Sequence, residues 1–307
     1  MIAIVGATGV LGGELTRQLL ASGERVVAIT RDASRARDLA SLGAEVRVAD
    51  LVDHASLAPA IRGVDAVIAA AHGLLGRGRN ASGSVDDAGH RALIDAAREQ
   101  RVSHFVYTSV VGASPSHPVA FWRTKYATER YLEASGLRHT ILRPTAFMET
   151  HAHMLLGKSV LEGKPAVVFG SGAQPLNFVA AADVAAIAVM AMRESDGGSR
   201  IIEIGGPDNL TRNDVVALYG RVSGRQARAR HVSTGALRVL SAVMRPFHEG
   251  LSGVMAASIS FETIDQSFDP AETLRRYPIR LTTLEEFVRA QAMRRTSREA
   301  GPAAVHR

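Results

Sequence analysis

Three glycines near the start of the chain, Gly6, Gly9 and Gly12, have a spacing that suits phosphate binding. They follow four apolar residues, 2–5, and precede leucines at helical spacing. A strand that enters a helix through a tight glycine turn leaves backbone N–H groups unpaired at the helix N-terminus, where they bind anions. Glycine lets the backbone approach the anion because it has no Cβ. The usual ligand is a dinucleotide pyrophosphate. The predicted binding run consists of Gly6, Ala7, Thr8, Gly9, Val10, Leu11 and Gly12.

The residues that follow the second apolar run, 25–30, indicate the type of dinucleotide. Thr30 stands where a NAD site places Asp or Glu, and Arg31 follows it directly. An arginine there can pair with a ribose 2′-phosphate in bidentate fashion, and Asp32 can cap the next helix. We therefore expect NADP(H) as the cofactor, with NAD(H) as the alternative.

Short apolar strands alternate with helices of about ten residues over the first 150 residues. This alternation indicates right-handed βαβ units and a Rossmann-type α/β fold, a doubly wound parallel sheet covered on both faces. The predicted strands are 2–5, 25–30, 44–48, 64–69, 104–108 and 138–142. The predicted helices are about 10–22, 33–42, 55–62, 84–99 and 120–135.

Beyond residue 150 the pattern loosens. We expect a dinucleotide-binding domain over 1–150, a small and mostly helical substrate lobe over 151–290, interleaved with the sheet edge but without a sheet of its own, and a basic flexible tail over 291–307. A ligand between lobe and sheet would meet the cofactor at the carboxyl ends of the strands. The elements expected are strands at 166–169 and 200–204, and helices at about 182–193, 211–223, 235–244, 270–276 and 283–295.

Composition excludes several classes of protein. The apolar share of 46% and the charged share of 21% are those of a soluble globular protein. No cysteine is present, so disulfides, thiolate metal sites and cysteine nucleophiles are excluded, and no histidine motif predicts a metal. The net charge of +6 comes without a recognition motif, so no nucleic-acid partner is expected.

The most apolar later run, 178–192, contains Asp183 and is too short to span a bilayer, so we expect no stable membrane insertion. Because the first strand begins at residue 2, no signal peptide is expected and a cytoplasmic location follows. The expected partner is a small-molecule substrate, and a homo-oligomer is possible.

The sequence Gly-Ala-Thr-Gly-Val-Leu-Gly at residues 6–12, with the run that leads through Pro144, resembles the extended and atypical short-chain dehydrogenase/reductases. It is most similar to the NmrA-like, NAD(P)H-binding branch. The resemblance covers residues 1–193 well and the C-terminal lobe more loosely.

This resemblance assigns expected roles to residues at the ends of further strands. Asp50 and Leu51 would meet the adenine, although Asp50 could instead cap a turn. Thr108 and Ser109 would lie beside the nicotinamide, with Ser109 in a catalytic role. The other expected cofactor residues are Ala70 and Ala71, too small to block the ligand, and Pro144, Thr145 and Ala146, whose backbone would face the carboxamide.

The family's Tyr-x-x-x-Lys pair corresponds here to Phe121 and Lys125. Lys125 would bind the nicotinamide ribose and act in catalysis, but Phe121 has no proton to give, so carbonyl reduction by the usual dyad is in doubt. Glu129 has the lysine–glutamate spacing of NmrA-like proteins. The alternative is that Lys125 and Glu129 form an exposed helical ion pair.

The resemblance implies an NADPH-dependent reductase that transfers a hydride to a small apolar or aromatic acceptor, such as a quinone or enone. The proton would come from water, Lys125 or a pocket histidine. The alternative is an NADP(H)-binding redox sensor with little turnover, and a third possibility, by family analogy only, is an assembly factor. The predicted substrate pocket consists of His72, Trp122, Phe147, Met148 and His151.

Overall fold

In the part of the chain that the structure describes, seven parallel strands form one sheet in the order β10-β6-β5-β4-β1-β2-β3. The structure is a computed structural model that describes residues 1–74, 76–194, 198–244 and 247–299. The order reverses between β1 and β4, which confirms the predicted doubly wound sheet. The strands are β1 (Ile2–Val5), β2 (Val26–Thr30), β3 (Glu45–Val48), β4 (Ala66–Ala69), β5 (His104–Thr108), β6 (His139–Pro144) and β10 (Arg200–Ile204).

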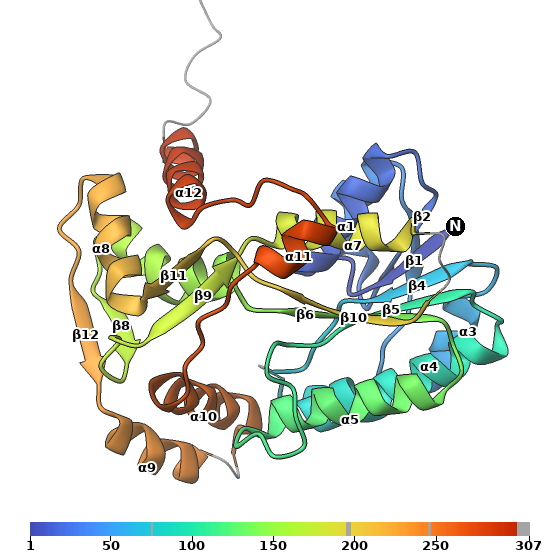
Figure 1. Ribbon diagram of the computed structural model, residues 1–307, viewed down its shortest axis with the longest axis horizontal. Helices are drawn as coiled ribbons and strands as arrows, with labels where there is room; N and C mark the ends of the chain where they lie inside the picture. Colours follow the sequence, from blue (N-terminus) through green and yellow to red (C-terminus); the bar gives the residue numbers. More distant parts are fainter. Residues whose placement is uncertain (75, 195–197, 245–246, 300–307) are drawn as a thin grey trace, which may run out of the picture.

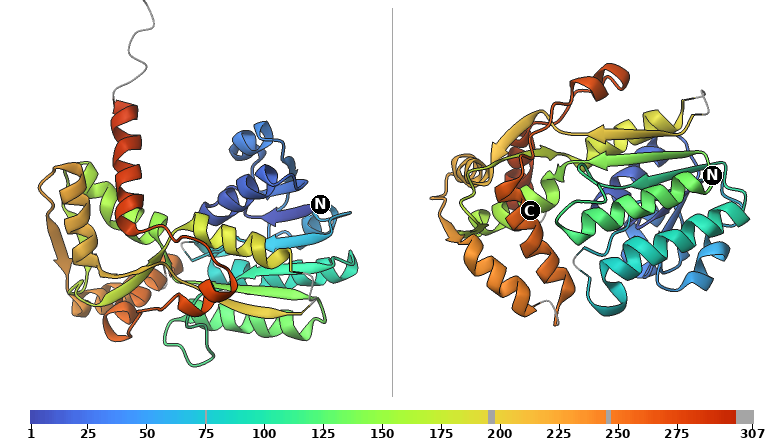
Figure 2. Two further views of the ribbon diagram at one scale, coloured as in Figure 1. Left: turned by 45° about the horizontal axis from the view of Figure 1, so that its top comes forward. Right: turned by 60° about the horizontal axis from the view of Figure 1, so that its bottom comes forward.

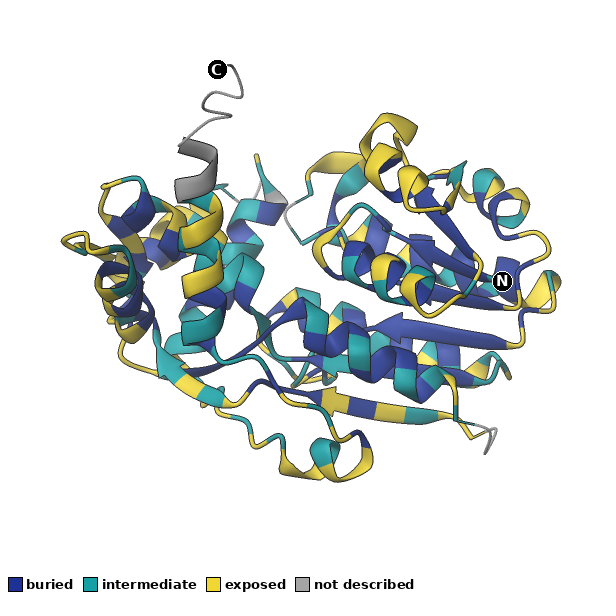
Figure 3. Cartoon of the chain, turned by 90° about the horizontal axis from the view of Figure 1, so that it is seen from above, coloured by how far each residue is buried: buried dark blue, intermediate teal, exposed yellow. Residues whose placement is uncertain are grey.

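The central strands are buried on both faces, which explains why their sequences are continuously apolar. In β1, Ile4 pairs with Ala28 of β2 on one side and with Ile68 of β4 on the other. The edge strand β10 instead mixes exposed and buried residues (Figure 3).

Helices cover both faces of this sheet (Figure 1). One apolar core lies under α1, α2, α7 and α11, and a second lies under α3, α4 and α5. The first group is α1 (Val10–Ala21), α2 (Arg37–Ser41), α7 (Ala181–Met192) and α11 (Ala271–Arg276). The second is α3 (Leu57–Ala60), α4 (His90–Glu99) and α5 (Ala120–Ala134). Between these strands and helices lie three short turns and a π-helix: η1 (Ala33–Ala36), η2 (His54–Ser56), η3 (Gly78–Asn80) and the π-helix η4 (Gly83–Gly89).

The expectation that the lobe lacks a sheet of its own is wrong. Two small sheets, β11-β9-β7 and β12-β8, lie within it (Figure 2). Their strands are β7 (Ala146–Phe147), β8 (Ala166–Phe169), β9 (Pro175–Val179), β11 (Asp208–Thr211) and β12 (Ala229–Val232). β9 and β11 escaped prediction because both are short and each contains an asparagine, a residue depleted in strands. The buried Asn177 of β9 is satisfied by the backbone of Gly206, to which its amide donates at 3.1 Å and from which it accepts at 2.8 Å.

The lobe also contains a helix that the sequence pattern did not predict. This is α10, which is rich in glycine and serine, residues of low helix propensity. The helix expected at 211–223 is confirmed as α8, and Thr211 and Asp214 form a capping box at its N-terminus. The lobe helices are the π-helix η5 (Met148–Gly157), α6 (Lys158–Leu161), α8 (Arg212–Ser223), α9 (Thr234–Met244), α10 (Glu249–Thr263) and α12 (Leu284–Glu299).

The lobe and the large sheet are joined by more than one crossing of the chain. After η5, α6 and β9, the chain returns to the sheet to form α7 and β10, and then re-enters the lobe. The division at residue 150 stays a prediction. α12 reaches Glu299, so residues 291–299 of the predicted tail are helical, and residues 300–307 lie outside the described residues.

Candidate functional site

The loop between β1 and α1 is shaped for close approach of a ligand. Gly6 has φ +86°, and a Cβ on Gly12 would lie only 2.2 Å from the carbonyl oxygen of Gly6. The Gly6 and Ala7 N–H groups both donate to the Ile29 carbonyl, at 3.2 and 3.3 Å, which fixes the loop against β2. Glycine is therefore required at both positions by backbone conformation or by space.

Four backbone N–H groups of this loop have no acceptor within the described ranges. They belong to Thr8, Val10, Leu11 and Gly12, at the N-terminal end of α1. Converging unpaired N–H groups at a helix N-terminus suit an anion with several oxygens. The predicted run from Gly6 to Gly12 therefore fits a pyrophosphate.

Arg31 lies directly after β2, exposed, and its Nη1 donates to Asn80 Oδ1 at 3.0 Å. Asp32 caps η1 by accepting the Ser34 N–H at 2.9 Å, so its carboxylate is engaged as the sequence had suggested. Hydrogen bonding to Ser34 lowers the pKa of Asp32. Arg31 thus places a cationic group at this strand end.

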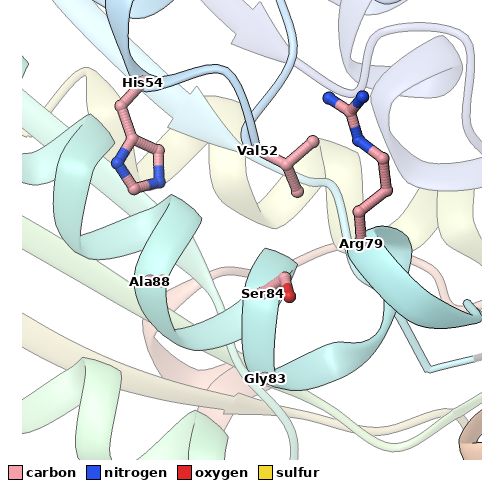
Figure 4. A pocket seen from close by; sticks show the side chains of 6 residues that line it. All are labelled: Val52, His54, Arg79, Gly83, Ser84 and Ala88. Atoms are coloured by element: carbon pink, nitrogen blue, oxygen red, sulfur yellow. The ribbon is translucent and has the colours of Figure 1, made fainter.

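Asp50 follows β3 and has two partners. Its Oδ1 accepts the Val52 N–H at 3.2 Å, and its Oδ2 lies 3.8 Å from Arg79 Nη2. The predicted turn-capping role is therefore present, and it leaves the adenine role open. Leu51 is only 5% exposed and belongs to the core under α4. A cavity of about 350 Å³ opens beside this strand end (Figure 4), lined by Val52, His54, Arg79, Gly83, Ser84 and Ala88.

Ala70 and Ala71 follow β4 and lie close to the glycine loop. The Ala70 N–H donates to the Val5 carbonyl at 2.9 Å, and a Cβ on Gly6 would lie 2.9 Å from the Ala71 nitrogen. The ends of β1 and β4 therefore meet at the point where the strand order reverses, which is where doubly wound sheets bind their ligands.

Lys125 is buried on the inner face of α5 and does not pair with Glu129. Its Nζ lies 3.0 Å from Asp86 Oδ1 and donates to the Thr108 carbonyl at 3.0 Å. Glu129 is also fully buried, and it pairs with Arg143 of β6 at 2.6 Å. The alternative of an exposed helical ion pair is wrong, because both side chains face inward and each has another partner.

Around Lys125 lie several buried polar atoms that have no hydrogen-bond partner within the described residues. These atoms are the hydroxyl groups of Tyr107, Thr108 and Ser109, His90 Nε2, and Asp86 Oδ1, whose contact with Lys125 is an ion pair. Burial raises the pKa of Tyr107 to about 12 and lowers that of His90 to about 4. An unpaired buried polar atom is costly, so the group at the carboxyl end of β5 is suited to receive a polar ligand.

The segment after β6 is held between the sheet and the lobe. The Thr145 N–H donates to the Ile204 carbonyl at 2.9 Å, and the Pro144 carbonyl accepts the Val111 N–H at 3.1 Å. The Thr145 hydroxyl donates to Asn177 Oδ1 at 2.9 Å, and Ala146 pairs with Phe178. The segment that Pro144, Thr145 and Ala146 form is therefore fixed where three strands meet.

An aromatic cluster lies between the first turn of α5, the lobe helix η5 and α10. The ring of Phe121 packs edge-on against His72 and Trp122, with ring centroids 6.4 and 5.6 Å apart. Phe261 packs edge-on against Trp122 and His151, with centroids 6.1 and 6.0 Å apart. Trp122 is 5% exposed and donates from Nε1 to the Val111 carbonyl. The predicted pocket residues His72, Trp122 and His151 are thus brought together.

The other two predicted pocket residues lie differently. Phe147 is partly buried against the core under α7, and Met148 is fully buried in the core of the lobe. A fully buried side chain lines no open pocket, so the pocket role of Met148 is wrong. Its position at the start of η5 points it into the packing of the lobe rather than toward the sheet.

The two pocket histidines favour the neutral imidazole. Burial lowers the pKa of His151 to about 4, and crowding by protein atoms lowers that of His72, although its side chain is exposed. Neutral imidazoles can accept or donate hydrogen bonds at neutral pH, but they are much weaker acids than imidazolium and transfer a proton poorly.

Sequence reasoning missed Asp86, Asn80, Arg79 and Phe261, which come from η4, η3 and α10. Asp86 stands among other polar residues at 82–87, so the sequence around it does not indicate a functional role. Among the described residues, no group of three His, Cys, Asp or Glu side chains could hold a metal ion. Nor does any described helix combine the length and apolar character needed to cross a bilayer.

Comparisons with known proteins agree with this geometry. The profile of the NmrA-like family matches residues 1–288. Quinone oxidoreductase 2 of Escherichia coli is 29% identical over 294 residues, which cover 94% of this chain and 97% of that protein. The NAD(P)H azoreductase of Xenophilus azovorans is 29% identical over 229 residues, which cover 74% of this chain and 76% of that protein.

The fold also matches a solved structure along nearly its whole length. The crystal structure of the NADPH-dependent quinone oxidoreductase of Escherichia coli, complexed with NADPH, superposes with a TM-score of 0.75 at 27% identity. The match covers 95% of this chain and 99% of that one.

Proposed function

Because this chain belongs to the NmrA-like family, we propose that it is an NADPH-dependent reductase of a small apolar or aromatic acceptor, such as a quinone, an enone or a similar conjugated bond. The observation that carries the proposal is the glycine loop, where four N–H groups find no acceptor among the described residues and Gly12 has no room for a Cβ. The named relatives, a quinone oxidoreductase and an azoreductase, support the same class of reaction.

Residues at different strand ends would bind different parts of the cofactor. The run Gly6–Gly12 would hold the pyrophosphate, Arg31 the 2′-phosphate, and Lys125 the nicotinamide ribose. The bound cofactor supplies a hydride, and the protein supplies orientation and a water-poor surface. Ser109 lies at the end of β5, where the nicotinamide would sit, and its buried hydroxyl has no partner in the described part of the chain.

The aromatic cluster supports a planar acceptor. Phe121, Trp122 and Phe261 present rings edge to face, an arrangement suited to binding another ring. Phe121 stands in place of a proton-donating tyrosine, so the acceptor must be one whose product takes its proton elsewhere, as from water. Conjugated acceptors meet this condition, because the negative charge that forms on them is delocalised.

Turnover with a panel of acceptors tests the proposal. We expect loss of NADPH absorbance in the presence of a quinone, an enone or an azo dye, and little change with a simple aliphatic ketone. Lys125→Met should abolish this turnover, whereas Glu162→Gln, a surface substitution on the lobe, should not change it.

The alternative function is an NADP(H)-binding sensor, and the observation that favours it is Phe121. Tight NADPH binding with no turnover on any acceptor of the panel would exclude the reductase and favour the sensor. Absence of NADPH binding would exclude both.

A further inference from the structure

The ammonium group of Lys125 is held from two sides. Asp86 Oδ1 lies 3.0 Å from Nζ, and the Thr108 carbonyl accepts from it at 3.0 Å. Both side chains of the ion pair are almost fully buried, at 3% exposed for Lys125 and 0% for Asp86. A lysine has three N–H donors, so one remains for a ligand. The rings of Tyr107 and Phe121 lie 4.9 and 5.5 Å from Nζ and limit its movement.

We propose that Asp86 is the positioning residue of Lys125: its carboxylate keeps the buried ammonium charged and directs it, with one N–H free, toward the ribose of the cofactor. The inference rests on the proposed function for the identity of that ligand. It also assigns Lys125 the role of a permanent cation, and not of the acid that replaces the missing tyrosine.

Asp86 is the one carboxylate that contacts Lys125 in the part of the chain that the structure describes. The other titratable groups facing it are Tyr107 of β5, His90 of α4 and His72 of the loop after β4. The tyrosine stays protonated and the two imidazoles favour their neutral form, because burial raises the pKa of Tyr107 and lowers that of His90, and crowding by protein atoms lowers that of His72. None of the three supplies a negative charge at neutral pH.

The pKa directions of the pair agree with the geometry. Burial by itself would lower the pKa of Lys125, but the charge of Asp86 outweighs it and the pKa is raised. Burial would likewise raise the pKa of Asp86, and Lys125, followed by His90 and His72, outweighs it, so that this pKa is lowered. The pair is therefore charged throughout the neutral range. Without the carboxylate, a buried lysine loses its proton easily.

The second carboxylate oxygen of Asp86 binds the backbone next to the predicted pocket residue His72. Oδ2 accepts the Gly73 N–H at 2.8 Å, next to His72 in the aromatic cluster. The backbone carbonyl of Asp86 also accepts the Thr128 hydroxyl at 2.7 Å. An asparagine at this position can keep the contact with Gly73 through its amide oxygen, which turns its NH2 group toward Lys125. An NH2 group cannot accept from an ammonium, so Asp86→Asn removes both the charge and the acceptor with little change of shape.

Nuclear magnetic resonance of the lysine side chains tests the inference without any cofactor. The chain contains only three lysines, Lys125, Lys158 and Lys164, so labelled lysine gives three side-chain signals, and Lys125→Met identifies the one that belongs to Lys125. In the wild type we expect the Lys125 signal to titrate above the ordinary lysine value of about 10.4. In Asp86→Asn we expect it to titrate at least about two pH units lower.

Glu162→Gln is the matched control, because it removes the carboxylate that pairs with Lys164 on the surface at 2.9 Å. It should leave the Lys125 signal unchanged. A Lys125 signal that titrates below about pH 9 in the wild type, or one that moves by less than about one unit in Asp86→Asn, overturns the proposal.

Cofactor affinity provides the second readout. In Asp86→Asn we expect the NADPH dissociation constant to rise about tenfold or more between pH 7 and pH 9, because Lys125 loses its charge over that range. In the wild type and in Lys125→Met it should change by less than about threefold. An equal pH dependence in all three proteins overturns the positioning role. If the wild type binds no NADPH, the proposed function fails while the lysine titration still decides the role of Asp86.

Folding of the variants is checked by circular dichroism. If Asp86→Asn does not fold, Asp86→Asn with Lys125→Met should, because the double variant leaves no buried charge without a partner. Folding of the double variant alone supports the counter-ion role. If neither variant folds, the wild-type titration of Lys125 decides.

Discussion

Glu129 Oε2 lies 2.6 Å from Arg143 Nη2 across the interface between α5 and β6. A second bond, from Arg143 Nε to Glu129 Oε1 at 3.0 Å, makes the pair bidentate. The carboxylate is completely buried, whereas the arginine keeps some exposure and also reaches Glu203. The pair fixes the register of α5 on the sheet, and α5 is the helix that carries Lys125.

Loss of this carboxylate should destabilise the fold. Glu129→Gln leaves Arg143 without its buried partner, and we expect it to lower the free energy of unfolding by about 3 kcal/mol. Urea denaturation of the variant measures this loss. Glu133→Gln, which removes the partner of Arg130 on the surface of the same helix, should cost less than about 0.5 kcal/mol. Similar losses of unfolding free energy in the two variants would show that burial does not make the Glu129 pair more stabilising than a surface pair.

A single methyl group at Gly12 should abolish cofactor binding. The added Cβ would lie 2.2 Å from the Gly6 carbonyl oxygen, so the loop must shift and its free N–H groups lose their arrangement. The adjacent Gly13 is the control, because a Cβ there would meet the end of the Arg17 side chain at 3.4 Å and the Ala7 carbonyl oxygen at 3.7 Å, which are ordinary contact distances. Calorimetric titration with NADPH should show no binding for Gly12→Ala and unchanged binding for Gly13→Ala. Binding by both variants would contradict the assigned phosphate site.

Arg31→Ala should distinguish between the two nicotinamide dinucleotides. We expect NADPH affinity to fall about tenfold or more, because a charge-assisted contact with the 2′-phosphate is lost, while NADH affinity changes little. Arg35→Ala removes an exposed arginine of η1 and should leave both affinities as they are. Equal losses for the two cofactors in Arg31→Ala would refute the assignment.

Acid should destabilise the protein partly through His90. The imidazole is completely buried, contacts the Val85 carbonyl from Nδ1 at 2.8 Å, and has its pKa lowered to about 4, mainly by burial. The folded protein therefore binds this proton less tightly than the unfolded chain. The stability due to the neutral ring is present above about pH 6.5 and is lost as the pH falls toward 4, by roughly 3 kcal/mol in full.

His90→Phe should flatten this part of the profile. Urea denaturation between pH 7 and pH 4 should show a smaller loss of stability for the variant than for the wild type. The loss should not vanish, because burial lowers the pKa of His104 and His151 to about 4 as well. An unchanged slope would mean that His90 is protonated in the folded protein.

The sequence predicted those parts of the molecule that depend on neighbours along the chain. The strands of the large sheet are apolar runs, and the residues after them, from Gly6 to Ser109, lie at the carboxyl edge because parallel strands share it. The partners of Lys125 and Glu129 could not be read in the same way. Four-residue spacing on a helix brings two side chains to one face, but η4 and β6 decide which charges meet them there.

The lobe was predicted less well for a related reason. Met148 follows the last predicted strand and was expected to line the pocket, yet its side chain packs in the lobe core, since sequence spacing does not tell which side of η5 faces the sheet. Phe261 lies in α10, where glycines and serines hide the helix from pattern analysis. Both positions depend on long-range packing between η5, α8 and α10.

The late return of the chain to the large sheet has a consequence for biosynthesis. α7 packs along α1, and β10 closes the edge beside β6, so the side of α1 that meets α7 has no apolar cover until residues 181–192 are made. A nascent chain that ends near residue 150 has every residue expected to contact the dinucleotide and still lacks the support for them. The helix that begins at the glycine loop reaches its full packing only when about two thirds of the protein has been made.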